Sequence, residues 1–440
     1  MNTKSLFSVV LACAGVAWAE PANKAAPVAD QLPEGILLRG STDKEQAFYA
    51  PNEPITFTMK VDASNAKGKL AKGFKIVWTR TGDDGKTENG EEDAGKPVVV
   101  KTSLSKPGFV RLVAHLKGPG GKVFGAEPVS FNGGAGVQPE KLKSTMEPKD
   151  FDEFWTAQKA KLAKVSFKNV KREKQESKNP KVEIYAVSIP CAGPRPVTGY
   201  ITIPVEAKTT PMRARLLVDG YSGNRIQRAP KDGPVTIVEL HINAHGYELG
   251  KPDEYYKAFY ESIKSNGNGY ALDTEQNKDR DKAYFNGMSL RVMRALQYLK
   301  SLPEWNKKDL CVQGGSQGGL QTIWGASLDP DVTEANASVP WCCNLAREPE
   351  GRIGIGWGVH YTPAILYFDP IYLAKRINKN CKFTIPRAGL GDYVCPPSGV
   401  AILYNVLPCA KKIKWVQGST HGFVPTQPNQ QFELSDGKWE

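Results

Sequence analysis

The 440-residue chain contains 40% hydrophobic residues and nine tryptophans, which excludes an intrinsically disordered protein and indicates sizeable cores. Lysine and arginine outnumber aspartate and glutamate by 58 to 46, a formal net charge of +12, but the basic residues are scattered rather than gathered in a block. We therefore expect a solvated surface and no nucleic-acid partner, with steering of an anionic polymer as the alternative.

The first residues have the pattern of a secretory signal peptide. A basic start precedes an apolar run over residues 6–14, and Ala17 and Ala19 stand at the two small-residue positions of a cleavage site. We expect a signal peptide over 1–19, cleaved after Ala19, and a secreted or periplasmic mature protein; a buried helix and lipidation at Cys13 are the alternatives. No later stretch reaches the roughly 20 apolar residues of a membrane span, so we expect none.

Seven of the eight cysteines follow the expected cleavage site. An odd number leaves at least one free thiol, so the chain is not a disulfide scaffold. No cysteine or histidine cluster has zinc spacing. We expect neither a metal nor a cofactor.

Residues 20–33 are rich in Ala and Pro and are expected to form a linker. The region 34–132 then shows alternating apolar and polar residues, as over 55–61, interrupted by turns. Roughly seven short strands in about 100 residues predict a small immunoglobulin-like β-sandwich. We expect this domain to supply no catalytic group, and a chain starting near residue 140 to keep turnover on a small ester. A glycine-rich segment opens a second expected linker, 133–145.

From residue 146 to 440 strands and helices alternate, which predicts an α/β domain with a mostly parallel sheet and helices on both faces. The expected strands are 215–218, 236–240, 310–313, 382–385 and 412–416. One expected helix starts at residue 150, and three more cover 285–299, 319–328 and 398–406.

The strand 310–313 leads into Gly314-Gly315-Ser316-Gln317-Gly318-Gly319 and then a helix. This is the Gly-x-Ser-x-Gly nucleophile elbow in a strand–turn–helix context. Gly314 and Gly318 allow a sharp turn in which a side chain two positions from the serine would collide with neighbouring chain. We predict Ser316 as the nucleophile; a chance match and a phosphate-binding turn are the alternatives.

A serine nucleophile needs a base and an acid, which in this fold follow it in the order acid, then histidine. His421 comes just after the last expected strand and is the predicted base; His360, in an irregular aromatic-rich segment, is the rival. Asp392 follows the preceding strand and is the predicted acid, whereas the rival Asp369 has no such strand. The oxyanion hole is predicted from the backbone N–H groups of Gln317 and of Tyr221, in the loop after strand 215–218.

These motifs resemble the acetyl xylan esterase and cephalosporin-C deacetylase family, carbohydrate esterase family seven. The elbow 314–319 and the segment Asp392-Tyr393-Val394-Cys395-Pro396-Pro397-Ser398 match that family's two long motifs, and 151–155 and the helix 284–296 look like its other conserved parts. The resemblance covers about residues 145–425. It implies an α/β-hydrolase that removes acetyl groups from carbohydrates, with Tyr221 at the family's oxyanion position.

Three features depart from the family. Its Arg-Gly-Gln after the second strand is absent at 241–247, Gly422 replaces a glutamate, and the domain 34–132 is extra. These departures leave the family's oligomeric ring and detailed substrate preference open, and an oligomer remains one option.

The sequence thus predicts a secreted serine esterase acting on acetylated xylan or xylo-oligosaccharides. A serine peptidase of the prolyl-oligopeptidase type and a catalytically dead hydrolase carrying a carbohydrate-binding module are the rivals. Four aromatic residues near the expected site could stack on sugar rings or be buried in the core: Trp341, Trp357, Tyr361 and Phe423.

Overall fold

The computed structural model describes residues 32–124, 129–222, 226–354, 358–426, 428 and 430–438. The expected signal peptide, its cleavage site, Cys13 and Trp357 lie outside these residues, as does nearly all of the first expected linker. Within the described ranges, no helix is long and apolar enough to cross a membrane.

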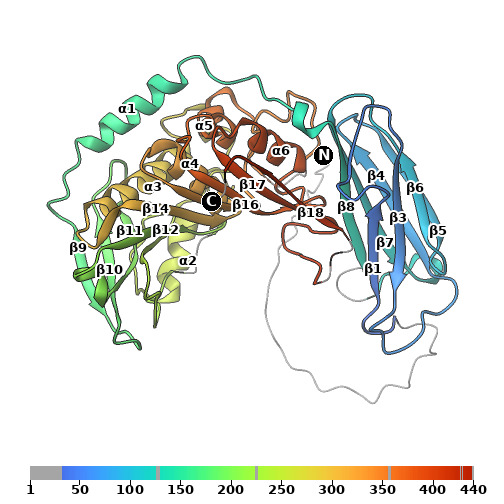
Figure 1. Cartoon of the computed structure of the whole chain (residues 1–440), viewed down its shortest axis with the longest axis horizontal. Helices are drawn as coiled ribbons and strands as arrows, with labels where there is room; N and C mark the ends of the chain where they lie inside the picture. The colour runs from blue at the N-terminus through green and yellow to red at the C-terminus, as the bar shows by residue number, and fades with distance from the viewer. Residues whose placement is uncertain are drawn as a thin grey trace, which may run out of the picture.

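The N-terminal domain is a sandwich of two sheets (Figure 1). One sheet has the strand order β1-β3-β6 and the other β2-β8-β7-β4-β5. The strands are β1 (Leu37–Thr42), β2 (Phe48–Tyr49), β3 (Ile55–Asp62), β4 (Lys75–Gly82), β5 (Thr87–Asp93), β6 (Val98–Thr102), β7 (Gly108–Lys117) and β8 (Ser130–Val137), with a 3-10 turn at Pro119–Gly121. In β3, Ile55, Phe57 and Met59 are fully buried, as the alternation predicted.

The glycine-rich segment predicted to open a linker at residue 133 is instead the second half of β8, paired antiparallel with β7. Its glycines allow close packing: a Cβ atom at Gly134 would lie 2.6 Å from the carbonyl oxygen of Leu390. The prediction of a linker at this point is therefore wrong. The chain leaves the sandwich only after Val137, through a 3-10 turn at Pro139–Lys141.

The C-terminal domain is built on one ten-stranded sheet of order β18-β17-β16-β15-β14-β12-β13-β11-β10-β9. Its strands are β9 (Lys171–Gln175), β10 (Val182–Ile189), β11 (Val197–Pro204), β12 (Met212–Val218), β13 (Val238–Ile242), β14 (Trp305–Gly315), β15 (Glu334–Ser338), β16 (Lys382–Gly389), β17 (Ala410–Val416) and β18 (Gln431–Asp436). Its helices are α1 (Phe151–Ala163), α2 (Asp253–Ser262), α3 (Tyr284–Ser301), α4 (Gln317–Leu328), α5 (Pro370–Ala374) and α6 (Pro397–Val406), with 3-10 turns at Val205–Lys208, Gln276–Lys278 and Pro363–Phe368.

The six strands β12 to β17 are parallel to their neighbours, and antiparallel strands flank them on both sides. This confirms the predicted α/β fold. Helices lie on both faces but unevenly: α1, α3, α4, α5 and α6 are on one side of the sheet in Figure 1, and α2 is on the other.

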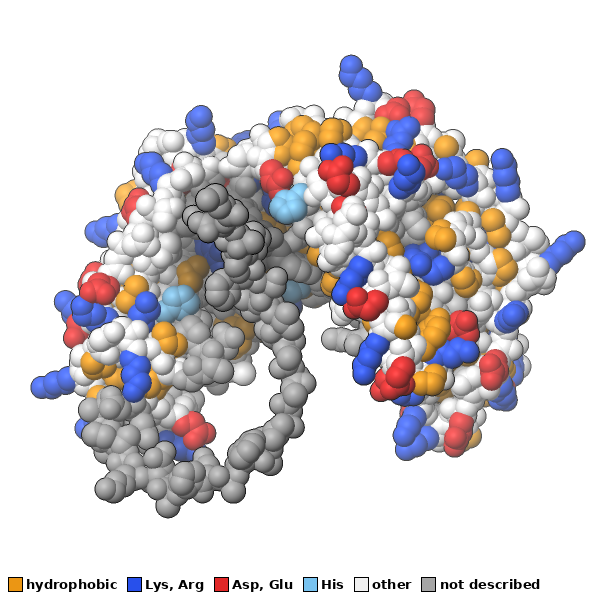
Figure 2. Space-filling view, turned by 180° about the vertical axis from the view of Figure 1, so that it is seen from behind, with side chains coloured by type: hydrophobic (Ala, Val, Ile, Leu, Met, Phe, Trp, Pro, Cys, Tyr) orange, Lys and Arg blue, Asp and Glu red, His pale blue; other side chains and the backbone are white. Residues whose placement is uncertain are grey.

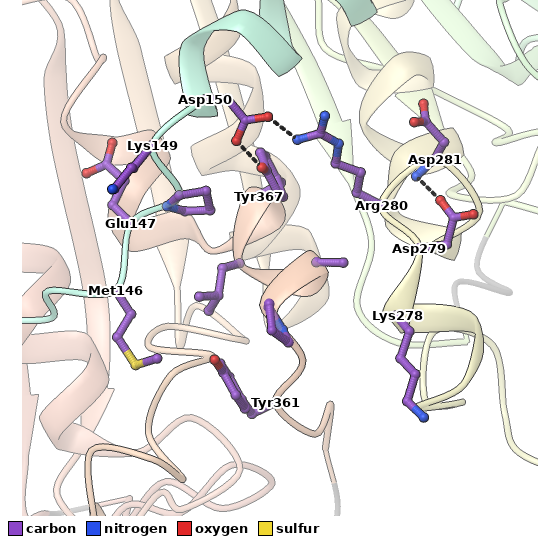
Figure 3. A pocket seen from close by; sticks show the side chains of 14 residues that line it. Met146, Glu147, Lys149, Asp150, Lys278, Asp279, Arg280, Asp281, Tyr361 and Tyr367 are labelled. Atoms are coloured by element: carbon purple, nitrogen blue, oxygen red, sulfur yellow. Dashed lines mark hydrogen bonds and ion pairs between the residues drawn. The ribbon is translucent and has the colours of Figure 1, made fainter.

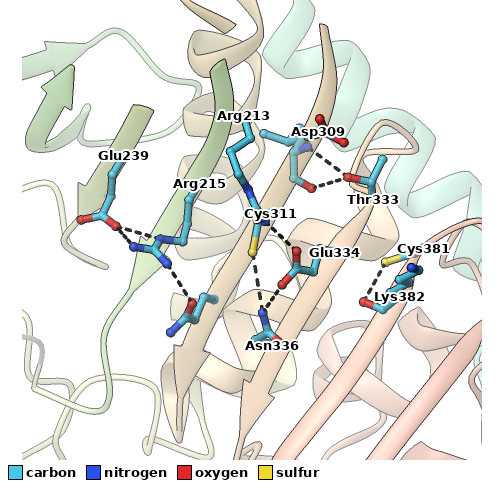
Figure 4. A network of polar contacts seen from close by, with 12 residues as sticks. Arg213, Arg215, Glu239, Asp309, Cys311, Thr333, Glu334, Asn336, Cys381 and Lys382 are labelled. Atoms are coloured by element: carbon cyan, nitrogen blue, oxygen red, sulfur yellow. Dashed lines mark hydrogen bonds and ion pairs between the residues drawn. The ribbon is translucent and has the colours of Figure 1, made fainter. Parts of the chain in front are cut away.

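The less covered face of the central strands carries a network of polar side chains (Figure 4). Arg215 on β12 pairs with Glu239 on β13, and Arg213 pairs with Glu334 on β15 at 2.6 Å. Asn336 donates to Glu334 at 2.8 Å. Because side chains alternate across a strand, the intervening residues face the helices and are buried.

The two domains share a packed aromatic contact. The Phe48 ring meets those of Trp415 on β17 and Phe432 on β18 edge-on, with centroids 5.9 and 5.1 Å apart. Phe109 on β7 packs against Trp415 as well, and its side chain belongs to the hydrophobic core of the large domain. The sandwich is therefore joined to the β17–β18 side of the large sheet, as Figure 1 shows.

Charge is dispersed on the molecular surface. On the face shown in Figure 2, lysine and arginine side chains are spread among acidic ones and form no single block. This agrees with a solvated surface and gives no support on that face to a site for an anionic polymer.

Candidate active site

Ser316 occupies a strained turn between β14 and α4. Its backbone has φ 58° and ψ −120°, values that a residue with a side chain rarely adopts. Gly314 and Gly318 make the turn possible, because a Cβ at either would lie 2.5 or 2.4 Å from the carbonyl oxygen of Val218 on the neighbouring strand. The serine is thereby presented at the N-terminus of α4, where the helix dipole favours negative charge.

The three residues predicted from the sequence as nucleophile, base and acid lie in one hydrogen-bonded row. Nε2 of His421 is 2.9 Å from Oγ of Ser316, and its Nδ1 is 3.0 Å from Oδ2 of Asp392. Asp392 follows β16 in the chain and His421 follows β17, so parallel neighbouring strands end at the same edge as the elbow. The geometry is that of a nucleophile, a base and a group that orients the base.

Asp392 is only 1% exposed. Its second oxygen, Oδ1, accepts the backbone N–H groups of Val394 and Cys395 at 3.1 and 2.9 Å, which hold the carboxylate in place. The Cys395 thiol lies 3.6 Å from Nδ1 of His421 and donates to the carbonyl of Val339; burial raises the pKa of this thiol, so it is kept protonated.

Asp392, Cys395 and His421 have potential metal-ligand atoms within 4.8 Å of one another, and no other such group of three occurs in the described part of the chain. Each of the three side chains already has a partner inside the row or on the backbone. We therefore interpret the cluster through proton transfer rather than as a metal site.

The two predicted oxyanion residues flank the elbow. Gln317 is the first residue of α4, directly after the nucleophile. Gly220, which precedes Tyr221, lies beside the elbow: a Cβ built there would be 3.8 Å from that of Ser316. The Tyr221 ring stacks on Tyr270, with centroids 4.2 Å apart and planes 7° from parallel.

Tyr270 was not predicted as a site residue, yet it links both sides of this region. Its hydroxyl accepts the backbone N–H of Ser222 and donates to Oε1 of Gln317, each at 2.7 Å. The Tyr221 hydroxyl in turn donates to the Tyr270 carbonyl at 2.9 Å. Tyr270 thus connects the loop after β12 to the first residue of α4.

Behind Tyr270 lies a fully buried histidine. The His245 ring meets the Tyr270 ring edge-on at 4.5 Å, and its Nδ1 is 2.8 Å from the Tyr284 hydroxyl. Burial, with help from the charges of Arg291 and Arg195, lowers the pKa of His245 well below its usual value. His245 is therefore neutral, and it packs against Tyr270 and hydrogen-bonds to Tyr284.

The two rivals from the sequence are elsewhere. His360 is half exposed and pairs with Glu348 at 2.9 Å. Asp369 is buried at the start of α5, where it accepts the backbone N–H groups of Asn344, Leu345 and Ile371. Burial raises the pKa of Asp369 to about 7, while these donors oppose the rise. Its contact with Ile371 is that of a helix cap, and its other two contacts hold the segment after β15.

Ser316 and His421 open into a cavity of about 500 Å³. Gln313, Asn336 and His241 line it, so the cavity continues onto the polar face drawn in Figure 4. His241 pairs with Asp219 at 3.0 Å. Several side chains that can form hydrogen bonds with hydroxyl groups therefore line the same cavity as the proposed nucleophile.

A second hollow, of about 850 Å³, lies away from the triad (Figure 3). Asp150 on its wall binds both the Tyr367 hydroxyl and Arg280. Tyr361, one of the four aromatic residues from the sequence, lines this hollow and not the catalytic cavity.

The other two aromatic residues that the structure describes also differ from each other. Trp341 is buried, and its ring meets that of Tyr221 edge-on at 5.5 Å. Phe423 is 55% exposed beside His421. Its ring is therefore exposed, two positions after His421 in the chain, but it does not line the catalytic cavity.

A nucleophile elbow, histidine and acid at the carboxyl edge of such a sheet define a hydrolase of the α/β type. The family model for acetyl xylan esterase (AXE1) matches residues 140–350 and 361–435, more than half of the chain, so the chain belongs to that family and is a carboxylic ester hydrolase.

Among curated proteins, the chain is similar to acetyl esterase Axe7A of Xylanibacter ruminicola, with 29% identity over 338 residues, 72% of each chain. Solved structures with this fold include acetyl xylan esterase from Paenibacillus sp. R4, at 21% identity and a TM-score of 0.52, and acetyl xylan esterase 1 from Thermoanaerobacterium sp. JW/SL YS485, at 20% and 0.54. In both cases the matched region covers 66% of this chain and 94% of the solved chain.

Proposed function

We propose that the protein removes acetyl groups from a carbohydrate through an acyl-enzyme on Ser316, with His421 as base, Asp392 as acid and the backbone N–H groups of Gln317 and Tyr221 as the oxyanion hole. The observation that carries this proposal is the hydrogen-bonded row Asp392–His421–Ser316, with contacts of 3.0 and 2.9 Å.

In the first half-reaction, Oγ of Ser316 attacks the ester carbonyl carbon and gives its proton to Nε2 of His421. Asp392 accepts a hydrogen bond from Nδ1, which fixes the tautomer and stabilises the positive imidazolium. The oxyanion of the tetrahedral intermediate accepts hydrogen bonds from the two backbone N–H groups. When this intermediate collapses, His421 protonates the leaving sugar oxygen, and the alcohol is released.

In the second half-reaction, His421 takes a proton from water, and the resulting hydroxide attacks the acetyl-serine. Collapse of this second intermediate breaks the bond to Oγ of Ser316, which recovers its proton from His421, and acetic acid leaves and ionises in water. These proton transfers use side chains and water alone.

Acetylated xylan or xylo-oligosaccharides are the proposed substrates. The family match and the likeness to an acetyl esterase support the acetyl group. The polar lining of the catalytic cavity supports a hydroxyl-rich alcohol part, because a few directed hydrogen-bonding groups give a pocket its specificity.

The test measures acetate released from acetylated xylo-oligosaccharides, together with hydrolysis of acetate, propionate and butyrate esters of one chromogenic alcohol. Tyr221 follows Gly220, which lies beside Ser316, and the N–H of Trp341 donates to the Ser316 carbonyl at 3.1 Å. If these residues limit the acyl group, each poorly accommodated methylene should cost about 10–200-fold. Rates that stay equal or rise along the series would contradict the acetyl assignment. Faster cleavage of a dipeptide amide would favour a peptidase, and Ser316→Ala controls for background.

We also infer that the chain is exported, since the apolar run over 6–14 is followed by the Ala17–Ala19 pair. The intact mass of protein recovered outside the cytoplasm should correspond to a chain beginning at Glu20. A mass that includes a lipid on Cys13 would contradict cleavage at that point.

A further inference from the structure

We propose that the N-terminal β-sandwich holds the catalytic acid and base in register, with Gln417 and Gly391 as positioning residues that dock the two catalytic loops on strand β8. This inference rests on the proposed function, because it concerns the loops that carry Asp392 and His421. It assigns a role to a domain that supplies no side chain to the triad.

The base loop is fastened to the sandwich by one side chain. Gln417 follows β17 and stands four residues before His421. Its Nε2 donates to the carbonyl of Gly134, and its Oε1 accepts the N–H of the same residue, both at 2.9 Å. The amide thus pairs with the backbone of β8 as a neighbouring strand would, and at 2% exposure it does so without competition from water.

The acid loop lies directly against the same strand. A Cβ at Gly391, the residue before Asp392, would lie 1.9 Å from the carbonyl oxygen of Asn132 on β8. A Cβ at Gly134 would lie 2.6 Å from the carbonyl oxygen of Leu390. The backbones of β8 and the acid loop are therefore in contact, with no room for a side chain between them.

The two loops are also joined to each other. The N–H of Leu390 donates to the carbonyl of Val416 at 3.0 Å, and that of Gly391 to the carbonyl of Ser419 at 3.1 Å. A displacement of either loop from β8 would therefore move the other, and with it the distance between Asp392 and His421.

Arg111 on β7 adds a third contact from the sandwich. Its guanidinium lies over the ring of Tyr393, 4.5 Å from the centroid, and its Nε donates to Asn132 at 3.1 Å. Burial lowers the pKa of Arg111, while the nearby Tyr393 and Asp392 oppose that change. The sandwich thus places a half-buried cation next to the segment of the proposed catalytic acid.

Loops that only needed to fold could tolerate small shifts, but a catalytic row cannot. A misplacement of about 1 Å in a catalytic group costs roughly 10²-fold in rate. We therefore expect the loss of these contacts to lower the kcat of the folded enzyme, in addition to any loss of folded protein.

The experiment compares Gly391→Ala and Gln417→Ala with Gly422→Ala in the full chain. Gly391 and Gly422 each adjoin a triad residue, but a Cβ at Gly422 would have no atom within 4 Å. For each protein, kcat and KM on a chromogenic acetate ester are measured per active site, counted by titration of Ser316 with a fluorophosphonate, together with the rate of that labelling.

We expect kcat and the labelling rate to fall together, by about 10–100-fold, in Gly391→Ala and Gln417→Ala, with KM unchanged and Gly422→Ala close to wild type. A purely structural role would lower the number of titratable sites and leave kcat per site intact, which would overturn the inference. If the wild-type chain neither hydrolyses the ester nor takes the label, the proposed function itself fails.

Discussion

At the residue scale, His421 and His360 stand in opposite surroundings. His421 has an acid on one ring nitrogen and the elbow serine on the other, whereas His360 pairs with Glu348 at the surface. His421→Ala should lower kcat by roughly 10⁴–10⁶, as losses from such units do. His360→Ala should stay near wild type on the same chromogenic ester. The reverse result would show that the base was assigned to the wrong histidine.

Tyr270 offers a second test at this scale. Tyr270→Phe removes the hydroxyl that binds both Ser222 and Gln317, so the two sides of the proposed oxyanion hole lose their link. We expect kcat to fall about 10-fold at constant KM, less than the roughly 10²–10³ for loss of an oxyanion donor itself. Tyr256→Phe is the matched control, because its buried hydroxyl also binds backbone but lies away from the elbow. Equal effects of the two variants would contradict the role of Tyr270.

The hydrogen-bonded row Asp392–His421–Ser316 could be predicted, but Tyr270 could not, and the reason is physical. Ser316 sits in a motif whose glycines are required by the turn itself, and the order of the following strands limits where Asp392 and His421 can be. Tyr270 reaches the site from an irregular segment, through contacts between residues 47 positions apart. No local pattern marks such a contact.

At the element scale, two buried aspartates have different roles: Asp369 caps a helix, and Asp392 is the proposed catalytic acid. Asp369→Ala leaves three backbone N–H groups without their acceptor, that of Ile371 at the start of α5 and those of Asn344 and Leu345 in the segment after β15. The free energy of unfolding of this variant should therefore fall by about 1–3 kcal/mol. Its kcat per folded molecule should not change. Asp392→Asn should do the opposite, lowering kcat by about 10³–10⁴ with little effect on stability. Denaturant unfolding and esterase kinetics on both variants check this.

Strand β3 was found from sequence at nearly its observed position, whereas β14, expected at 310–313, spans Trp305–Gly315, and the apolar strands β10 and β11 were not among the expected ones. Strand β8 was missed because Gly133, Gly134 and Gly136 carry no side chain and therefore show no alternation. In sequence they resemble a flexible linker; in the structure they permit the close approach of Leu390 and Gly391.

At the scale of the whole molecule, the sequence indicated two domains but not that they form one unit. Period-two patterns show which residues face a core and not which core they face, so the whole region 34–132, which includes Phe109, was assigned to the sandwich. In the structure it packs against Trp415 of the large sheet. The expectation that a chain starting near residue 140 keeps turnover on a small ester now has the contacts of Gly134 and Arg111 against it.

The shared core predicts that both domains unfold together. Phe48 contacts Trp415 and Phe432 across the interface, so unfolding of the sandwich would expose apolar surface on β17 and β18 as well. Calorimetry should therefore give one transition whose van't Hoff and calorimetric enthalpies agree. Phe48→Ala should lower the free energy of unfolding by about 1–3 kcal/mol, less than for a fully buried phenylalanine because Phe48 is only partly buried.

Phe124→Ala is the matched control for this prediction. Phe124 is also a partly buried phenylalanine of the sandwich, but it packs on Phe74 within that domain, with ring centroids 5.3 Å apart. Both variants should lose stability, whereas only Phe48→Ala should weaken the coupling and broaden the transition. Two resolved transitions in the wild-type chain, unmoved by Phe48→Ala, would show that the domains unfold independently and that the aromatic contact does not couple them.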